Sequence, residues 1–415
     1  MDNLLHWIWL SLSVKPGGES FKKLYERFSS VESIYNADKD EIAAVIGSRS
    51  FDYKSLCEKE LDRAESVLNF CRSKNVGILI YADENYPENL RKIPNPPVLL
   101  YYRGTLPDFK SELCISVVGS RSVSNYGCKN AFYVSRDLAK AGAVIVSGMA
   151  IGIDGVALAG ALSEGSVTVA VIGSGIDVCY PSQHQRLARE IVKRGCVFTE
   201  YAPGSRPNKI NFPVRNRIIS GLSEATLVIE GSETSGSLIT ARRAFKQGRK
   251  VYALPGNVGN KNSEGPNLLI KNGAKAFSSA DDIVRDFYET HVGKLNPHNL
   301  LRPSSKSMAS VLSEYEIAAL SPDDKVFIPS RKKSARVNGS ETPLPKKADG
   351  EKAMKLSKLD KLHRDLYEKI PQGESITQES LVSSELPMRD LMRALLKLEV
   401  SGLITMLPGD MLKRN

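Results

Sequence analysis

Residues 115–121 read ISVVGSR, an apolar run of strand length that ends in a tip of small and basic residues. Similar segments follow at intervals of about 25 residues, and helical patterns separate them. They are AVIVSG (Ala143–Gly148), VTVAVIGSG (Val167–Gly175), CVFTEY (Cys196–Tyr201), ATLVIEG (Ala225–Gly231), KVYALPG (Lys250–Gly256) and AKAF (Ala274–Phe277). This alternation predicts an α/β protein with a doubly wound, mostly parallel sheet. In such sheets ligands bind beyond the carboxyl ends of the strands, where these polar tips gather.

The composition is that of a soluble protein with several domains. The chain has 415 residues, of which 41% are hydrophobic and 25% charged, and its net charge is +10. A basic balance favours a polyanionic partner. The six cysteines form no CxxC pair and no metal-like cluster, so we expect reduced thiols in the cytoplasm and no bound metal.

The chain divides into four predicted parts. Residues 1–95 show helical periodicity, and their apolar start, LLHWIWLSLSV, predicts a buried first helix, since it lacks a signal-peptide pattern and is too short to span a membrane. A strand at Gly77–Asp83 and a loop at Tyr86–Gly104 lead into the sheet domain, residues 96–290. Residues 291–355 have the composition of a flexible basic linker. Residues 356–415 predict three short helices and a two-strand wing, that is, a winged helix, whose neutral charge favours packing against protein.

The strand tips carry candidate phosphate-binding groups. Gly119, Ser120 and Arg121 follow the first strand of the sheet, where a helix N-terminus and a guanidinium both suit phosphate. Gly148 permits close backbone approach after the second strand. A tight turn with a solvated arginine explains the first tip equally well. The sequence contains neither GxGxxG nor GxxxxGK[ST], which disfavours a dinucleotide cofactor and Walker-type ATP hydrolysis.

Residues 207–225, PNKINFPVRNRIISGLSEA, form the densest candidate site. An aromatic residue beside paired arginines is typical of single-stranded nucleic-acid sites, where each stacked base contributes about 1–3 kcal/mol. The candidates here are Phe212, Arg215, Asn216 and Arg217, and those after the fifth strand are Ser235, Gly236, Ser237 and Thr240. Residues 205–275 contain twelve basic and four acidic residues, so most of the excess charge lies beside these motifs. A solvated helix face remains the alternative for part of this charge.

These motifs together resemble the DNA-processing protein A (Smf) family. The matching run is GSR…SGMAIGID…AVIGSG…YP…FPVRNRIISGL…SGSLITA…ALPG, within residues 86–283. The resemblance implies an extended Rossmann domain, a helical amino-terminal domain of the SAM or helix-hairpin-helix kind and a winged helix. The function implied is non-catalytic: single-stranded DNA is bound, protected and passed to RecA recombinase in natural transformation. One departure is Ala157-Leu158, where the family usually has Ala-His.

The resemblance also implies a binding pocket and a dimer. The pocket residues carried over are Ser120, Arg121, Phe212, Arg215, Arg217 and the loop 235–240. A head-to-head homodimer would use residues 268–277, with Leu269, Ile270 and Phe277 as apolar contacts. Two alternatives remain open. One is a Rossmann-type phosphoribohydrolase-like enzyme with Glu200 or Glu230 beside a ribose, and the other is a protein scaffold that acts through its winged helix.

Overall fold

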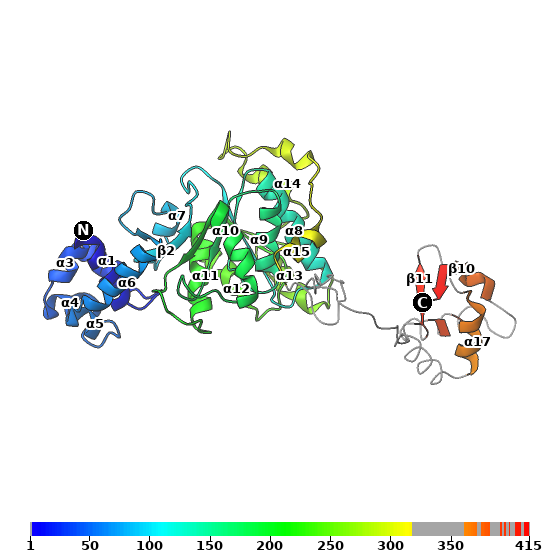
Figure 1. Ribbon diagram of the computed structural model, residues 1–415, viewed down its shortest axis with the longest axis horizontal. Coiled ribbons are helices and arrows are strands. Elements are labelled where there is room, and N and C mark those ends of the chain that lie inside the picture. Colours follow the sequence, from blue (N-terminus) through cyan, green and yellow to red (C-terminus); the bar gives the residue numbers. More distant parts are fainter. Residues whose placement is uncertain are drawn as a thin grey trace, which may run out of the picture. The chain divides into compact units, whose positions relative to one another are not determined.

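The computed structural model describes residues 2–317, 361–371, 375–381 and, between 391 and 414, shorter stretches and single residues of the carboxyl-terminal segment. The chain forms two compact units, residues 1–331 and 332–415. The first unit is built on a nine-stranded sheet (Figure 1). Its strands are β1 (Gly77–Ile80), β2 (Leu99–Gly104), β3 (Cys114–Val118), β4 (Val144–Ser147), β5 (Thr168–Val171), β6 (Cys196–Thr199), β7 (Ala225–Val228), β8 (Lys250–Ala253) and β9 (Lys275–Ala276).

The strand order is β1-β2-β6-β5-β4-β3-β7-β8-β9. Strands β3 to β9 are parallel, while β2 pairs antiparallel with β6 and with β1. The chain winds outward from β3 through β4, β5 and β6, then returns to the other side of β3 to form β7. The order therefore reverses between β3 and β7, which is the topological switch point of a Rossmann-like sheet. The predicted doubly wound, mostly parallel sheet is confirmed.

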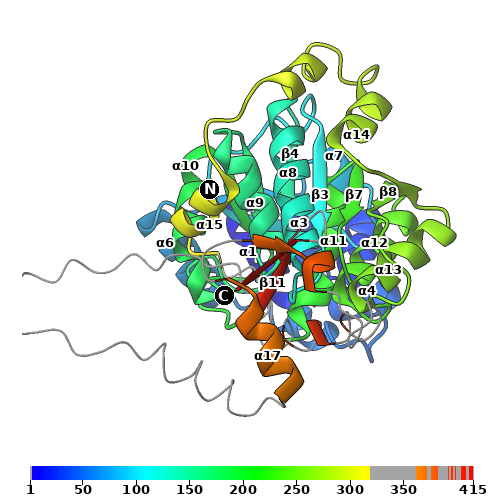
Figure 2. The same cartoon turned by 90° about the vertical axis from the view of Figure 1, so that its right-hand side faces the viewer.

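Two helical layers cover the sheet (Figure 2), as its alternating buried side chains require. Ile115 and Val117 of β3 belong to one core cluster, whereas Cys114 and Val118 belong to the other. The first layer contains α8 (Asn125–Lys140), α9 (Ile153–Ser163), α10 (Gln185–Arg194), α14 (Ala280–Phe287) and α15 (Met308–Glu314). The second contains α7 (Glu88–Arg91), α11 (Asn211–Leu222), α12 (Gly236–Lys246) and α13 (Lys261–Lys271).

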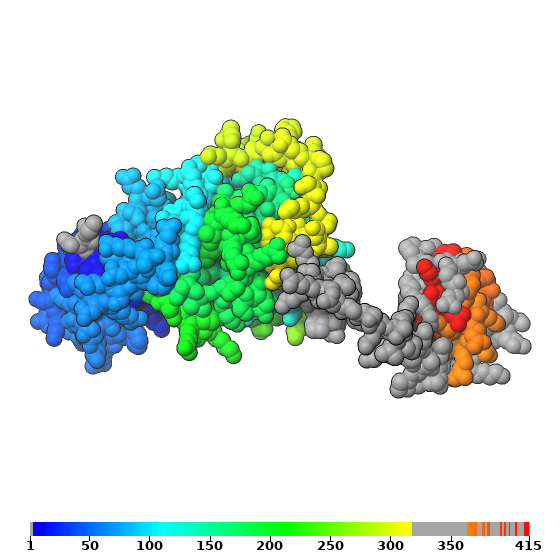
Figure 3. Space-filling view, viewed as in Figure 1, coloured from blue at the N-terminus to red at the C-terminus, as the bar shows by residue number. Residues whose placement is uncertain are grey.

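Six helices precede the sheet and share a core with its edge. They are α1 (Asp2–Ser13), α2 (Ser20–Phe28), α3 (Val31–Asn36), α4 (Lys39–Ile46), α5 (Tyr53–Glu58) and α6 (Asp62–Ser73). The predicted first helix is confirmed, with Trp7, Ile8, Trp9 and Leu10 buried. Val98, Leu99 and Tyr101 of the β2 segment join the same cluster. The helical segment and the sheet form one continuous body (Figure 3), and β1 comes from residues that the sequence assigned to the helical domain.

The predicted loop at residues 86–104 is partly wrong. Its last six residues form β2, which extends the sheet antiparallel beyond β6. Tyr101 is fully buried between this edge and the amino-terminal helices, so tertiary packing determines the strand.

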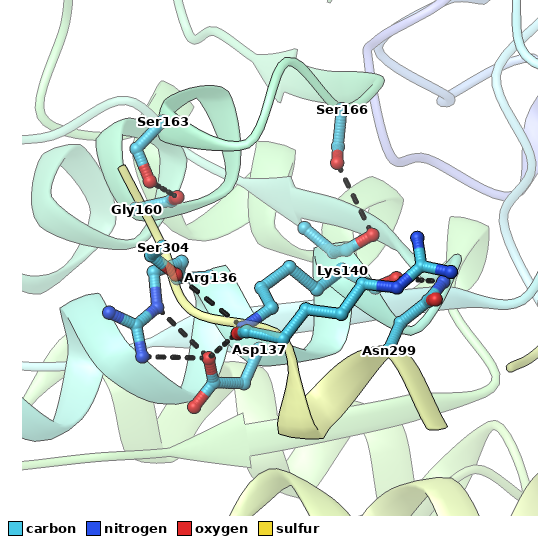
Figure 4. Close-up of polar contacts among 10 residues, drawn as sticks. Arg136, Asp137, Lys140, Gly160, Ser163, Ser166, Asn299 and Ser304 are labelled. Atoms are coloured by element: carbon cyan, nitrogen blue, oxygen red, sulfur yellow. Dashed lines mark hydrogen bonds and ion pairs between the residues drawn. The ribbon is translucent and has the colours of Figure 1, made fainter. Parts of the chain in front are cut away.

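The flexible linker predicted for residues 291–355 is wrong for its first part, which is folded. Residues 297–301 form a 3₁₀ helix, η2, and α15 buries Val311 and Leu312 against α9. Lys140 at the end of α8 holds this segment (Figure 4): its Nζ donates to the Arg302 carbonyl, and Asn299 donates to the Lys140 carbonyl at 3.0 Å. Residues 318–355 of the predicted linker lie outside the described residues.

The carboxyl-terminal unit contains a three-stranded antiparallel sheet. Its described elements are α17 (Lys361–Lys369), β10 (Ser375–Thr377), a 3₁₀ turn at Gln378–Leu381, β11 (Ile404–Leu407) and β12 (Met411–Arg414). The first of the three predicted helices and the paired strands of the predicted wing are present, but the second predicted helix starts as β10 and a 3₁₀ turn. The winged helix as a class stays a prediction. Within the described residues, no helix is long and apolar enough to cross a membrane.

Candidate nucleic-acid interface

A cleft of about 660 Å³ opens at the switch point between β3 and β7. Residues 118–122, from the last residue of β3 onward, form one wall. Residues between 232 and 240, which follow β7 and begin α12, form another. The start of α11 supplies a third wall, with Phe212, Arg215 and Asn216. The sheet topology thus brings together motifs that are about 100 residues apart in the sequence, as the carboxyl-edge argument predicted.

An aromatic and cationic cluster marks one side of the cleft. The guanidinium carbon of Arg121 lies 5.3 Å from the centroid of the Phe212 ring. The Tyr180 ring lies 5.5 Å from the same ring at an interplanar angle of 34°. Arg121 and Tyr180 are exposed, and Phe212 is half-buried. These flat groups leave surface open for a further flat ring to stack.

Arg215 lies at the floor of the cleft and is buried. Its Nη1 donates to the Gly148 carbonyl at 2.7 Å and to the Val171 carbonyl. Burial lowers the pKa of its guanidinium to about 10, a shift that Asp154 opposes and Arg121 increases. Arg215 therefore remains a cation at neutral pH, but its Nη1 already has backbone partners. The group supplies positive charge from beneath the cleft.

Gly148 and Asp154 complete this floor. A Cβ at Gly148 would overlap the Arg215 guanidinium, so the glycine makes room for that side chain. Gly148 lines a small neighbouring cavity, not the main cleft. Asp154 lines the cleft, and burial raises the pKa of its carboxyl against the opposing effect of Arg215. Asp154 lies within the first turn of α9, whose N-cap is Gly152, with φ of 89°.

The amino terminus of α12 faces the cleft with small polar groups. Ser235 is the N-cap residue, and its hydroxyl pairs with that of Ser237 at 2.5 Å. Gly236 and Thr240 also line the cleft. The first N–H groups of a helix have no intrahelical acceptor, so this end is suited to an anion.

The structure does not bring Arg217 into the cleft. Its Nη2 lies 2.5 Å from Glu200 Oε1, and both side chains are buried. A Cβ at Gly17 would lie 3.1 Å from Arg217 Nε, which places this ion pair beneath the amino-terminal segment. Arg217 therefore connects α11 to β6 and to the helical segment. As a nucleic-acid contact it is a wrong expectation, for it points away from the cleft that Arg215 lines.

Neither candidate catalytic glutamate lines the cleft. Glu200 is paired with Arg217, and Glu230 accepts hydrogen bonds from the Ser124 backbone at 3.0 Å, the Ser124 hydroxyl and Asn262 at 3.4 Å. Burial raises the pKa of Glu230, and these donors oppose the shift. Its carboxylate joins the starts of α8 and α13 to the end of β7.

All but two of the twelve predicted binding residues line the cleft, the exceptions being Gly148 and Arg217. The residues that the prediction missed include Tyr180, Lys209, Lys261 and Asn262. Lys209 and Lys261 were counted in the local charge excess, and Tyr180 stands in the quoted YP motif. The sequence thus indicated the charge or aromatic character of these residues but not that they line the cleft. Tyr180 and Lys209 lie in loops, whose course the sequence does not predict, whereas Lys261 and Asn262 begin α13.

The predicted dimer contacts are largely unavailable. Leu269 and Phe277 are buried in the cores on either side of the sheet, and Ile270 is half-buried. Their apolar character is explained by packing within one chain. A head-to-head contact through these three side chains, as expected from the sequence, therefore lacks the exposed surface that it needs.

Fold and cleft define a class: a Rossmann-like protein with a cationic and aromatic cleft at the switch point. The chain belongs to the DNA recombination-mediator protein A family, whose model matches residues 77–288. The predicted family resemblance is confirmed.

Several relatives support this assignment. DNA processing protein DprA of Streptococcus pneumoniae is 42% identical over 228 residues, which cover 55% of this chain and 79% of the relative. The protein of the same name from Bacillus subtilis is 36% identical over 244 residues, 59% of this chain and 82% of the relative. The X-ray structure of the S. pneumoniae protein superimposes with a TM-score of 0.58 at 35% identity and covers 67% of this chain and 97% of its own.

Proposed function

We propose that this protein binds single-stranded DNA in the cleft between β3 and β7, without catalysis, and passes it to RecA recombinase during the processing of incoming DNA. Family membership and the relatives named DNA processing protein DprA support the DNA-processing role. The observation that carries the proposal is the cluster of Arg121, Phe212 and Tyr180 at a cleft with further exposed cations.

Unpaired bases explain this cluster better than a duplex. A single strand offers the faces of its bases, and each base that stacks on an aromatic side chain contributes about 1–3 kcal/mol. A duplex hides those faces within its own stack, so that it offers only phosphates and groove edges. Tyr180 and Phe212 are placed for the first kind of contact.

The charges at the cleft are free to meet phosphates. Within the described residues, Arg121, Lys209 and Lys261 form no ion pair, and all three are exposed. A single strand that they neutralise releases counterions, with a slope of log affinity against log salt of about −0.7 per phosphate contact. Binding therefore weakens steeply as salt rises.

The alternative of a nucleotide-processing enzyme requires a glutamate beside a bound ribose. Glu200 and Glu230 have structural partners and do not themselves line the cleft, which favours binding without chemistry. Release of free base from nucleoside monophosphates tests this choice. Turnover that Glu230→Gln abolishes without unfolding the protein would establish the enzyme.

Arg121 is the residue to change, because it is exposed, whereas replacement of the buried Arg215 disturbs the fold. Arg121→Ala is expected to weaken binding of oligo-dT and to reduce the salt slope by about 0.7. Lys54→Ala, an exposed cation on α5, is the matched control and leaves both unchanged. Fluorescence anisotropy at a series of salt concentrations measures the affinity for oligo-dT and its salt slope. Equal binding of duplex and single strand, or an unchanged slope for Arg121→Ala, would contradict the proposal.

Recombinase hand-over and a homodimer complete the proposal. Two copies that align their clefts would hold a longer strand than one copy. Sedimentation measures the association, and RecA filament formation on single-stranded DNA, compared between the wild type and Arg121→Ala, measures the hand-over. A faster filament with the wild type alone is the expected result.

A further inference from the structure

A second candidate surface begins at the rim of the cleft and follows the exposed face of α8. Ser122 lines the cleft, and Ser124 caps the helix by accepting a hydrogen bond from the Gly127 N–H at 3.1 Å. The helix therefore starts at the edge of the proposed binding site. Its buried face packs on α9, leaving the opposite face to solvent.

Aromatic and cationic side chains share that face. Tyr126, Lys129, Tyr133 and Arg136 are spaced by three, four and three residues, which places them along one side of an α-helix. We call these four residues the α8 stripe. Tyr126 is 47% exposed and Tyr133 is 41% exposed. At 1.5 Å per residue, the stripe is about 15 Å long.

The tyrosine rings are held in place. The Tyr126 hydroxyl donates to the Pro255 carbonyl at 2.8 Å, so the ring is fixed at one end while much of it stays exposed. The guanidinium of Arg136 lies 4.8 Å from the centre of the Tyr133 ring. A ring that is already ordered loses little conformational entropy when another ring stacks on it.

The charge of the stripe favours an anionic partner. Lys129 is exposed and forms no ion pair within the described part of the chain. Arg136 pairs with Asp137 at 2.9 Å, so its charge is partly compensated (Figure 4). Arg121 lies on the side of the cleft that holds Phe212 and Tyr180, whereas Ser122, whose carbonyl accepts a hydrogen bond from Asn262 at 3.0 Å, begins the segment that leads to the stripe.

We propose that a single-stranded polynucleotide leaves the cleft past Ser122 and Asn262 and continues along the α8 stripe, stacking bases on Tyr126 and Tyr133 while Lys129 meets phosphate. This extension rests on the proposed function of the cleft. Stacking rings interleaved with cations are the arrangement by which proteins hold single strands without reading their sequence. The two exposed rings of the stripe add stacking positions for two bases to the site.

A double substitution tests the extension. Tyr126→Ala/Tyr133→Ala is expected to weaken binding of a long oligo-dT about 30-fold, the effect of losing two stacked bases at the low end of their range. A short oligo-dT that fills only the cleft keeps its affinity, which also shows that the loop held by Tyr126 is undisturbed. Tyr126→Phe/Tyr133→Phe retains the rings and is expected to retain the long-strand affinity.

The matched control is Phe51→Ala. Phe51 is 86% exposed and precedes α5 by two residues, and α5 lies at the end of the first unit away from α8 (Figure 1). The Phe51→Ala substitution removes an exposed ring that is not part of the α8 stripe, so the affinity for the long oligo-dT is expected to stay at the wild-type value. Anisotropy with both oligonucleotides measures all variants at one salt concentration.

The outcomes separate the extension from the cleft. If the alanine pair binds long and short strands as the wild type does, the extension is wrong and the cleft stands. If Phe51→Ala weakens binding as much as the alanine pair, the effect is general and the extension is also wrong. If the wild type binds neither strand, the proposed function itself fails. A 5-iodouracil strand that cross-links to Tyr126 or Tyr133 would place the bases directly.

Discussion

Arg215 and Arg217 show how two like residues on one helix take different roles. Residues that are two positions apart on an α-helix differ by about 200° in direction, so their side chains point to nearly opposite sides. Arg215 lines the cleft, whereas Arg217 turns to Glu200 and the amino-terminal segment. The sequence predicted a helix start with paired arginines but not its rotation about its axis, because residues on both sides of α11 are buried by tertiary contacts.

The Arg217–Glu200 pair gives the first prediction at this scale. Glu200→Gln leaves a buried, uncompensated guanidinium and is expected to lower the free energy of unfolding by about 3–5 kcal/mol. Arg217→Leu/Glu200→Leu removes both charges and restores much of that stability. Urea unfolding measures stability, and anisotropy is expected to show that the double variant still binds oligo-dT. If a stably folded double variant no longer binds oligo-dT, Arg217 contributes to DNA binding and our interpretation of it as a structural residue is wrong.

His184 gives a second prediction, for pH. The side chain is fully buried, its Nδ1 lies 2.9 Å from the Met149 carbonyl, and burial lowers its pKa from 6.5 against the effect of that hydrogen bond. The folded state thus disfavours the proton that the unfolded state accepts. The stabilising contribution is present above pH 6.5 and is lost as pH falls through the lower, folded-state pKa.

The measurement is urea unfolding at about pH 7.5 and about pH 5.5, which bracket ordinary histidine titration. His184→Gln is expected to lose less stability between the two values than the wild type does. His298→Gln, at an exposed position in η2, is the control and behaves as the wild type. Parallel losses in all three proteins would show that His184 does not contribute to the pH dependence.

At the level of elements, the sequence predicted the central parallel strands but not the antiparallel strand β2. Runs such as residues 144–146 are apolar on both faces, and only a strand covered by helices on both sides needs that pattern. Because the strands are parallel, their tips had to meet at one edge, and this was enough to predict most of the cleft. β2 escaped prediction because Pro96 and Pro97 directly before it are typical of a loop, although its leucines and tyrosines are compatible with a strand.

The parts of the cleft that were missed come mostly from irregular segments. Tyr180 and Lys209 lie between elements, where no periodicity relates sequence distance to direction. Similarly, α15 has only seven residues in a polar region, so four buried apolar side chains, two within the helix and two directly after it, did not stand out. They are Val311, Leu312, Tyr315 and Ile317, and their place in the core depends on α9.

At the scale of the whole molecule, the packing of α15 in the core leads us to expect that the first unit can be shortened after this helix but not before it. A chain ending at Ile317 is expected to unfold with the same transition as this unit in the full protein. A chain ending at Asn296 loses η2 and α15, and its unfolding free energy is expected to fall by about 3 kcal/mol. A buried valine or leucine contributes ~1.5–3 kcal/mol, and the entropy of ordering the segment offsets part of the total.

Thermal and urea unfolding of both shortened chains measure this difference. Oligo-dT binding by the chain ending at Ile317 serves as the control for an intact cleft. Identical stability of the two chains would mean that α15 packs too weakly to belong to the unit.

The sheet ends at β9, a strand of only two residues that begins with an exposed lysine. Sheets of separate molecules join edge to edge when a long, flat, apolar edge strand offers unpaired N–H and C=O groups. This edge offers almost none, and a lysine must be desolvated before a neighbour can dock there. Concentrated solutions of the protein should therefore resist fibril growth from this side of the sheet.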